Sequence, residues 1–157
     1  MKLTLRSEAA ADRAFLRELF GAVRRCELGL AGMDDAVLRP LLDMQFEAQR
    51  QSYRQAHPGA SFDIVEVDRV PAGRRVVAQS GGALLLVDIA LLPGWCGKGI
   101  GSALIRDLQR QAAGAALPLR LHVALNNRAE ALYRRLGFKE TGMSGMHRAM
   151  EWENHNE

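Results

Sequence analysis

Apolar and polar positions along this chain recur in patterns typical of alternating strands and helices. Leu3–Leu5 alternates as a strand does, and Ala9 to about Arg25 carries apolar residues near one face at helical spacing. Phe62–Val67 and Arg75–Ala78 predict two further strands, joined by a turn over Val70–Gly73. The first half of the chain is therefore expected to combine helices with antiparallel strands.

The segment between the first helix and the second strand contains one proline that limits where a helix can begin. A turn over Gly29–Gly32 ends the first helix, and His57-Pro58-Gly59 breaks the chain again. Proline lacks an N–H and clashes with the preceding helical turn, so it is best tolerated at a helix start. We predict that Asp34 caps a short turn and that the main helix runs from Pro40 to about Gln55.

The second half begins with the longest apolar run of the chain. Ala83–Leu92 does not alternate, which predicts a strand buried on both faces. A helix follows, with Ile100, Leu104 and Leu108 on its core face. A strand, a helix and two closing strands complete the order β-α-α-β-β-β-α-β-α-β-β, which predicts an α/β (α+β) fold with a mixed central sheet flanked by helices.

Length and composition favour one domain of residues 1–152 with a polar tail of 153–157. The chain has 157 residues, of which 48% are hydrophobic, enough for one core. The net charge of +3 comes without a long basic run, so no nucleic-acid partner is expected. The arginine pairs are most simply read as solvated faces: Arg24-Arg25, Arg74-Arg75 and Arg134-Arg135.

Cysteine usage and hydropathy indicate a reducing, cytoplasmic setting. Cys26 and Cys96 have no disulfide-scaffold, metal or redox spacing, and no metal site is expected. The start lacks an apolar signal core, and no apolar run is long enough for a membrane span, so no membrane partner is expected.

The segment most informative about function is the glycine-dense turn between the apolar strand and the next helix. Gly97, Gly99 and Gly101 lack a Cβ, so the backbone can adopt positive φ and approach a ligand closely. The first helical turn adds unpaired N–H groups and the positive end of the helix dipole. Together they favour a phosphate or pyrophosphate, and hence a phosphorylated cofactor.

Two common nucleotide-binding loops do not fit this turn. A Walker loop needs a hydroxyl after Gly-Lys, whereas Gly97-Lys98 is followed by Gly99. The dinucleotide fingerprint needs a two-residue gap before its last glycine, which the single spacings here do not provide. The alternative is a glycine-rich connection that binds no ligand.

The turn resembles motif A of the GCN5-related N-acetyltransferases, in which Gln or Arg, two residues, Gly, one residue and Gly or Ala follow one another. Gly99-Ile100-Gly101 fits the second half of the motif, while Cys96 stands at its opening Gln or Arg. The resemblance implies that the strand residues Ile89, Ala90 and Leu91 pair with the pantetheine arm of acetyl-CoA. It also implies that a run of loop residues lines the pyrophosphate: Cys96, Gly97, Lys98, Gly99, Ile100, Gly101 and Ser102.

The segment 119–138 is similar to the second signature of that family: a strand, Asn127, a helix with Tyr133, and Leu136-Gly137-Phe138. Asn127 followed by Glu130 predicts an N-cap with a capping box, and Gly137 predicts the helix end. By resemblance, Asn127 contacts the pantetheine, although capping alone also explains it. The resemblance makes Tyr133 the general acid that protonates the leaving coenzyme A thiolate, the alternative being a core tyrosine.

The resemblance implies an acetyl-CoA-dependent N-acetyltransferase that releases coenzyme A. A neutral primary amine attacks the thioester directly through a tetrahedral intermediate, and a backbone N–H near Leu91 polarises the carbonyl. Asp88 is the first candidate for the general base, with Glu66 and His122 as alternatives, and with an arginine-paired carboxylate as its structural explanation. Losing the Gln or Arg at Cys96 is expected to weaken cofactor binding about tenfold, partly offset by Lys98.

The expected acceptor is a small-molecule amine or a protein or peptide amine. Gln45, Gln49 and Tyr53 either face its cleft or form a polar stripe on a surface helix. An edge strand near the C-terminus can pair with another copy, which would give a homodimer. Two rival functions are a non-catalytic acyl-CoA-binding module of the same fold and, more distantly, a nucleotide-binding regulatory domain.

Overall fold

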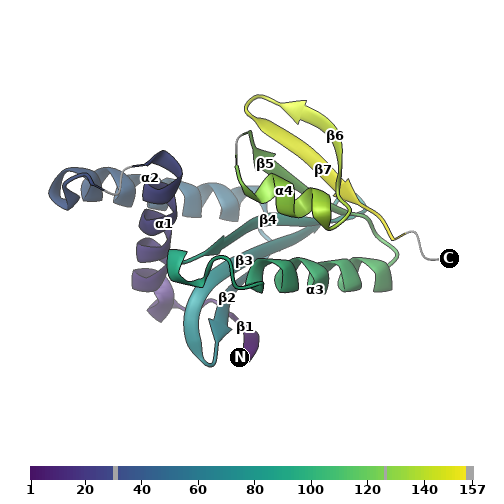
Figure 1. The fold of residues 1–157 in the computed structure, drawn as a ribbon, viewed down its shortest axis with the longest axis horizontal. Helices are drawn as coiled ribbons and strands as arrows, with labels where there is room; N and C mark the ends of the chain where they lie inside the picture. Colours follow the sequence, from purple (N-terminus) through teal and green to yellow (C-terminus); the bar gives the residue numbers. More distant parts are fainter. Residues whose placement is uncertain (30–31, 126, 155–157) are drawn as a thin grey trace. The chain divides into compact units, whose positions relative to one another are not determined.

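The computed structural model describes residues 1–29, 32–125 and 127–154. Leu30 and Ala31 of the predicted turn, and 155–157 of the predicted tail, lie outside these residues. Its helices and 3₁₀ turns, labelled in Figure 1, are η1 (Ala10–Asp12), α1 (Arg13–Leu28), α2 (Asp35–Ala56), η2 (Pro93–Trp95), α3 (Ile100–Gly114) and α4 (Ala129–Arg135). Its strands are β1 (Leu3–Ser7), β2 (Ser61–Val67), β3 (Val70–Ser80), β4 (Ala83–Leu91), β5 (Leu119–Ala124), β6 (Lys139–Ser144) and β7 (His147–Trp152).

Within the described residues, seven strands form one mixed sheet in the order β1-β2-β3-β4-β5-β7-β6. β4 and β5 pair in parallel, whereas β1 with β2, β5 with β7 and β7 with β6 pair antiparallel. This confirms the predicted α/β class and the predicted order of helices and strands. The described residues divide into two compact units that share strands β3 and β4, and each unit is best understood by itself.

The first unit comprises Met1–Val76 and Asp88–Gly97. Its core joins Leu16 and Leu19 of α1 with Phe46 of α2 and Ile64 of β2, all almost fully buried. Figure 1 shows α1 crossing α2, and the Phe20 and Phe46 rings meet between these helices with centroids 5.9 Å apart. Helical spacing of apolar residues therefore assembles this unit, as predicted for α1.

The second unit comprises Val77–Val87 and the chain from Lys98 onward. Ile100, Leu104 and Leu108 are buried along α3, which confirms the predicted core face. Leu121 of β5 and Met150 of β7 are buried and stand opposite each other in the strand register. The β6–β7 hairpin, yellow in Figure 1, closes the chain and contains a register shift between Glu140 and Gly142.

The predicted start of the second helix was wrong. α2 begins at Asp35, its N-cap Asp34 accepts a hydrogen bond from the Ala36 N–H at 3.0 Å, and Pro40 lies inside the helix. Pro40 removes the bond to the Ala36 carbonyl. Both residues are exposed, so water can reach that carbonyl, and the rest of the long amphipathic helix offsets the loss.

The turn before β3 was also misplaced. Asp68 and Arg69 both have positive φ, at 50° and 67°, and β3 starts directly afterwards at Val70. Aspartate tolerates this conformation better than most residues, and the Asp68 carboxylate accepts a hydrogen bond from the Lys2 N–H at 2.8 Å. Pro71 therefore lies in the strand and not in a turn.

Strand burial differs from the sequence prediction. β3 is buried continuously over residues 72–78, whereas only Ala83 and Leu86 are buried in β4 and its other residues are half-buried. Arg74 and Arg75 lie within the buried part of β3, with 7% and 4% of their surface exposed, so the expectation of a solvated pair was wrong there. Polar partners explain how Arg74 is accommodated, as described below.

β3 approaches β4 closely at Gly73, in the first unit. A Cβ at this position would overlap the carbonyl oxygen of Ala90 and lie 2.8 Å from Leu91 Cδ2. Beside it, the Leu92 N–H donates a hydrogen bond to the Ala72 carbonyl at 2.8 Å. Gly73 is therefore required by space and not by a turn.

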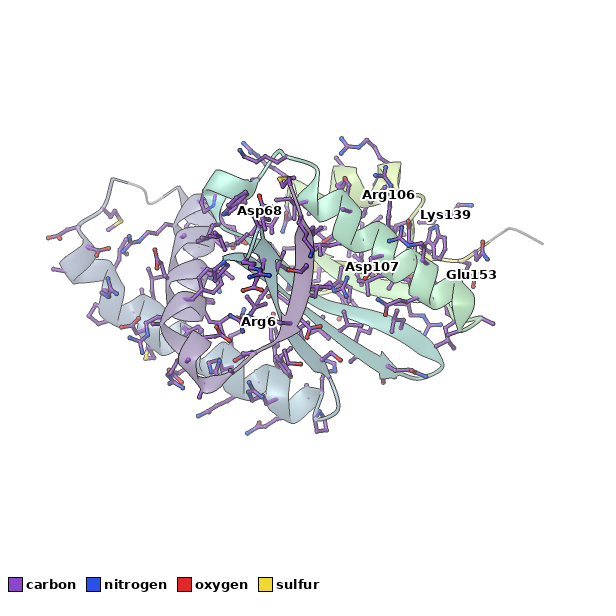
Figure 2. All side chains as sticks on the ribbon, turned by 90° about the horizontal axis from the view of Figure 1, so that it is seen from below. Arg6, Asp68, Arg106, Asp107, Lys139 and Glu153 are labelled. Atoms are coloured by element: carbon purple, nitrogen blue, oxygen red, sulfur yellow. The ribbon has the colours of Figure 1, made fainter. Side chains whose placement is uncertain are left out.

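Arg6 joins the first strand to the start of α1. Arg6, labelled in Figure 2, donates two 2.8 Å hydrogen bonds to the Asp12 carboxylate, and its Nε lies 3.1 Å from Glu66. The Ala9 N–H also donates to Asp12. These bonds hold the pKa of Asp12 at about 2, below its usual value of 3.8, because they favour the ionised carboxylate.

In the described part of the chain, no helix is both long and apolar enough to cross a membrane.

Replacing Gly73 with alanine is expected to lower the free energy of unfolding by about 2 kcal/mol or more, because the new methyl group collides with backbone. Gly59→Ala is the matched control, since a Cβ there meets nothing within 4 Å. Urea denaturation of both variants measures the difference. Equal stability of the two variants would show that β3 can move away from β4.

Replacing Asp12 with asparagine is expected to reduce stability at neutral pH but not at pH 2. The folded-state pKa lies below the unfolded value, so the carboxylate contributes fully above about pH 4 and its contribution disappears as the pH falls to about 2. Denaturation curves of wild type and variant between pH 2 and 7 should therefore converge at the acid end. Arg6→Met should reproduce this convergence, and parallel curves would argue against the Arg6 interaction.

Candidate functional site: a glycine turn, a strand and a tyrosine helix

The glycine turn leads directly into α3 and leaves its backbone accessible. Gly97 and Gly99 have φ values of 74° and 81°, as the positive-φ prediction requires, and Gly99 is the helix N-cap without a side-chain cap. Residues 96–99 are exposed. The first hydrogen bond inside the helix is donated by Ala103 to Gly99, so the preceding N–H groups have no partner within α3. The turn can thus present several N–H groups to an anion.

Gly101 has a different role from the other two glycines. It lies within α3, and a Cβ there would contact Leu132 Cδ2 of α4 at an ordinary 3.6 Å. Its backbone does not have positive φ, so that part of the sequence prediction was wrong for this position. A small residue here lets α3 and α4 approach within the second unit.

Strand β4 ends in apolar residues that the fold covers only partly. Ile89, Ala90 and Leu91 are half-buried. In the first unit, β3 binds the chain just beyond them through the Leu92 N–H. This apolar strand end can therefore accept an extended ligand along its length.

Cys96 occupies the position at which motif A has Gln or Arg. It is exposed, and its Sγ lies 3.6 Å from the Leu92 carbonyl oxygen and 3.9 Å from the Leu91 carbonyl oxygen, so the thiol donates back into the turn. This contact helps close the turn after η2. It makes no charge available for a ligand, so any anion here must rely on backbone N–H groups and on Lys98, which is also exposed.

Asn127 caps the short helix α4. Its side-chain oxygen accepts a hydrogen bond from the Ala129 N–H at 2.9 Å, and its carbonyl accepts from the Glu130 N–H at 3.2 Å. The predicted side-chain hydrogen bond from Asn127 to the start of the helix is thus present, but the N-cap residue is Arg128, so the predicted N-cap position and capping box were wrong. Gly137, with φ of 95°, follows the helix end as predicted.

Tyr133 is buried on the inner face of α4, with 5% of its surface exposed. Its ring contacts Phe138 with centroids 5.7 Å apart and planes inclined by 58°. The hydrophobic contact fixes the ring, as a core tyrosine requires, and it also fixes the direction of the hydroxyl. The phenol is therefore held in one orientation.

A cluster of charged residues attaches α4 to the β6–β7 hairpin. Arg148 of β7 pairs with Glu130 of α4 and, at 2.8 Å, with Glu140 of β6. Arg134 of α4 pairs with Glu130 at 3.2 Å and lies 3.9 Å from Glu140. A helix of two turns is marginal by itself, so this cluster and the Tyr133–Phe138 contact stabilise its position.

Asp88 belongs to a polar cluster inside the first unit. Arg74 Nε donates to Asp88 Oδ2 at 2.7 Å, and Arg74 Nη2 donates to the side-chain oxygen of Gln49. Arg74 Cζ lies 5.6 Å from the Tyr53 ring centroid. Gln49 and Tyr53 therefore contact β3 and do not form a merely solvated stripe. Burial, with a smaller effect of the Asp88 charge, raises the pKa of Tyr53 to about 12, so its phenol stays protonated.

The other carboxylate and the histidine considered as bases have different surroundings. Glu66 is half-buried and bound by Arg6, whereas His122 is exposed on β5, opposite Ala149. Among the described residues, no group of three His, Cys, Asp or Glu side chains is placed to hold a metal ion.

An arginine-paired carboxylate was the predicted structural explanation of Asp88, and Arg74 is that arginine. Arg74 itself was expected on a solvated face, yet it lies in the buried part of β3, fourteen residues before Asp88. That spacing across a hairpin was the available signal. Asp88 and the loop up to Gly97 lie in the first unit, while Asn127 and Tyr133 lie in the second.

The chain matches the model of a known protein family. The family model described as an acetyltransferase (GNAT) domain matches residues 59–140, more than half of the 157 residues. Among curated protein sequences, no match to the chain is found.

Several solved structures share the fold at low sequence identity. The PaiA N-acetyltransferase of Thermoplasma acidophilum, solved in complex with coenzyme A, is 17% identical with a TM-score of 0.75, over 98% of this chain and 100% of that one. An acetyltransferase of Thermus thermophilus is 19% identical with a TM-score of 0.73, over 98% of both chains. A chimera of spermidine N-acetyltransferase SpeG from Vibrio cholerae and hSSAT is 22% identical with a TM-score of 0.66, over 98% of this chain and 96% of that one.

The matched residues include the glycine turn, the strand preceding it and the capped helix of Tyr133, and the chain belongs to the GCN5-related N-acetyltransferase (GNAT) family.

Proposed function

We propose that this protein transfers the acetyl group of acetyl-CoA to a primary amine by direct attack. The observation that carries the proposal is the match to the acetyltransferase domain over residues 59–140, which includes β4 and the exposed glycine turn at the start of α3. Acetyl-CoA supplies an acetyl group activated as a thioester.

Several of the described residues support the binding of such a ligand. Backbone N–H groups of residues 97–102 would hold the pyrophosphate, since the turn is exposed, uncapped and at the positive end of the α3 dipole. Ile89, Ala90 and Leu91 would lie along the pantetheine arm. Asn127, which caps α4, would contact the same arm. Cys96 would border the pyrophosphate without contributing a charge.

The proposed chemistry uses two side chains. Asp88 accepts the proton that the amine loses as its nitrogen attacks the thioester carbonyl, and Tyr133 donates a proton to the sulfur as the carbon–sulfur bond breaks. No covalent intermediate on the protein is needed.

The acceptor is proposed to be a small-molecule amine or the amine of a protein or peptide. A reducing, cytoplasmic compartment fits Cys26 and Cys96, both exposed and both free. β6 is the last strand in the sheet order, so a second copy of the chain can add to its edge and form a homodimer.

Replacing Gly99 with alanine is expected to weaken coenzyme A binding about tenfold, because a methyl group at the N-cap of α3 disturbs the N–H groups that face the phosphates. Gly81→Ala is the matched control, since both glycines have positive φ and open space around the new Cβ. Calorimetric titration with coenzyme A measures both. Equal weakening in both variants would exclude a specific role for the turn at Gly99.

Replacing Tyr133 with phenylalanine is expected to lower kcat about a hundredfold or more while the Kd of coenzyme A stays within about twofold, because the ring contact with Phe138 survives while the hydroxyl proposed to donate the proton is removed. Mass-spectrometric detection of acetylated product over a panel of amines measures kcat. A thermal melting curve establishes that the variant is folded. Equal trace product from both proteins would favour a non-catalytic acyl-CoA-binding module.

A further inference from the structure

Arg74 is a buried cation whose partners come from two other elements. Its guanidinium, on β3, contacts Asp88 of β4 at 2.7 Å, the side-chain oxygen of Gln49 on α2, and the ring face of Tyr53 one helical turn further along α2. A buried guanidinium without such partners is strongly unfavourable. The contacts therefore fix Arg74 in one place, and through it the Asp88 carboxylate.

In the Arg74–Asp88 pair the arginine is the less exposed partner, whereas in the Arg50–Glu8 pair of the first unit the carboxylate is the less exposed partner. The Arg74 side chain is 8% exposed and the Asp88 side chain 23%. In the pair of Arg50 with Glu8 the arginine is 19% exposed and the carboxylate 8%. In that pair the carboxylate lies inside and the arginine covers it, which is the arrangement of a structural ion pair. Here the arginine lies inside, and the carboxylate stays accessible to a molecule arriving from solvent.

We propose that Arg74 is a positioning residue, which holds the accessible Asp88 carboxylate in a fixed direction to receive the acceptor amine. The proposal rests on the proposed acetyl transfer and on the role of Asp88 in it. Gln49 supports Arg74 from α2 and acts one step further from the reaction. Arg74 Cζ lies over the Tyr53 ring, 5.6 Å from its centroid, and this cation–π contact adds to the hydrogen bonds that hold the cation beside the carboxylate.

The charges around the Arg74–Asp88 pair determine whether it favours a neutral amine or an ammonium ion. Arg74 offsets the charge of Asp88, and on α1 the next charged groups near Tyr53 are Arg24 and Glu27, which pair at 3.6 Å. The surroundings are thus close to neutral. A neutral amine can approach the carboxylate and lose a proton to it as the nitrogen forms its bond with the thioester carbon, whereas an isolated carboxylate would hold a protonated ammonium as an unreactive ion pair.

The test is a double-mutant cycle on the kinetics of acetyl transfer to one amine acceptor. Arg74→Met is expected to lower kcat/KM for the acceptor about tenfold or more while KM for acetyl-CoA changes less than about twofold. In an Asp88→Asn background, Arg74→Met should change kcat/KM less than about twofold, because Arg74 acts through the group already removed. An equal effect in both backgrounds would overturn the proposal.

Further variants distinguish loss of the positioning role from loss of folding. Arg74→Lys, which keeps the charge, is expected to recover part of the loss in Arg74→Met. Gln49→Met, which keeps Arg74 and Asp88, should lower kcat/KM for the acceptor severalfold, and less so with Asp88→Asn. Arg50→Met is the matched control because it removes the arginine of a different arginine–carboxylate pair in the first unit, and its effect should be the same in both backgrounds. A fall in Arg50→Met equal to that in Arg74→Met would overturn the positioning role.

The outcomes separate this inference from the function on which it rests. Wild-type protein that acetylates none of a panel of amines would overturn the proposed function, and the role of Arg74 in it. Active wild-type protein with a fully active Asp88→Asn variant would leave the acetyl transfer standing and overturn the positioning proposal alone.

Discussion

The close approach of β3 to β4 at Gly73 is the constraint on which the rest of the first unit depends. Only a residue without a side chain leaves room for the Ala90 carbonyl and for Leu91. The approach lets the Ala72 carbonyl accept the Leu92 N–H, which fixes the end of β4 just before the glycine turn. It also places the next residue, Arg74, within hydrogen-bond distance of Asp88. The absence of a side chain at Gly73 thus determines both the path of β4 and the partner of the Asp88 carboxylate.

The two parts of the candidate site are stabilised by different physical means. In the second unit, α4 is short, and its tyrosine is held by the Phe138 ring and by the charged cluster around Arg148. In the first unit, one buried arginine ties a strand to a helix. The glycine turn depends on neither kind of side-chain contact, because its proposed ligand contacts are backbone N–H groups whose direction is set by α3. A ligand held by backbone depends little on the side chains of the loop, which fits a cysteine at position 96.

The sequence predicted most of the fold because its signals were local and strong. The order of elements, the core face of α3 and the left-handed glycines follow from periodicity and turn chemistry. Pro40 misled the prediction because interior proline is penalised, yet a long amphipathic helix with an exposed first turn can bear the loss. Gly73 looked like a turn residue, because a close approach of two strands has no signature in the residues around the glycine. An arginine partner for Asp88 was considered, but Arg74 was not singled out, because a buried arginine is recognisable only once its partner is known.

The buried arginine has a consequence for the order in which this chain folds. Arg74 is well hydrated in the unfolded chain and cannot be enclosed before a carboxylate compensates it. Asp88 lies fourteen residues away across a hairpin that turns at Gly81 and Gly82, two glycines already suited to the reversal. Loops of roughly this length close in about 10–100 ns, far faster than distant strands meet. We therefore expect the hairpin to form this ion pair early in folding, before α2 packs over it.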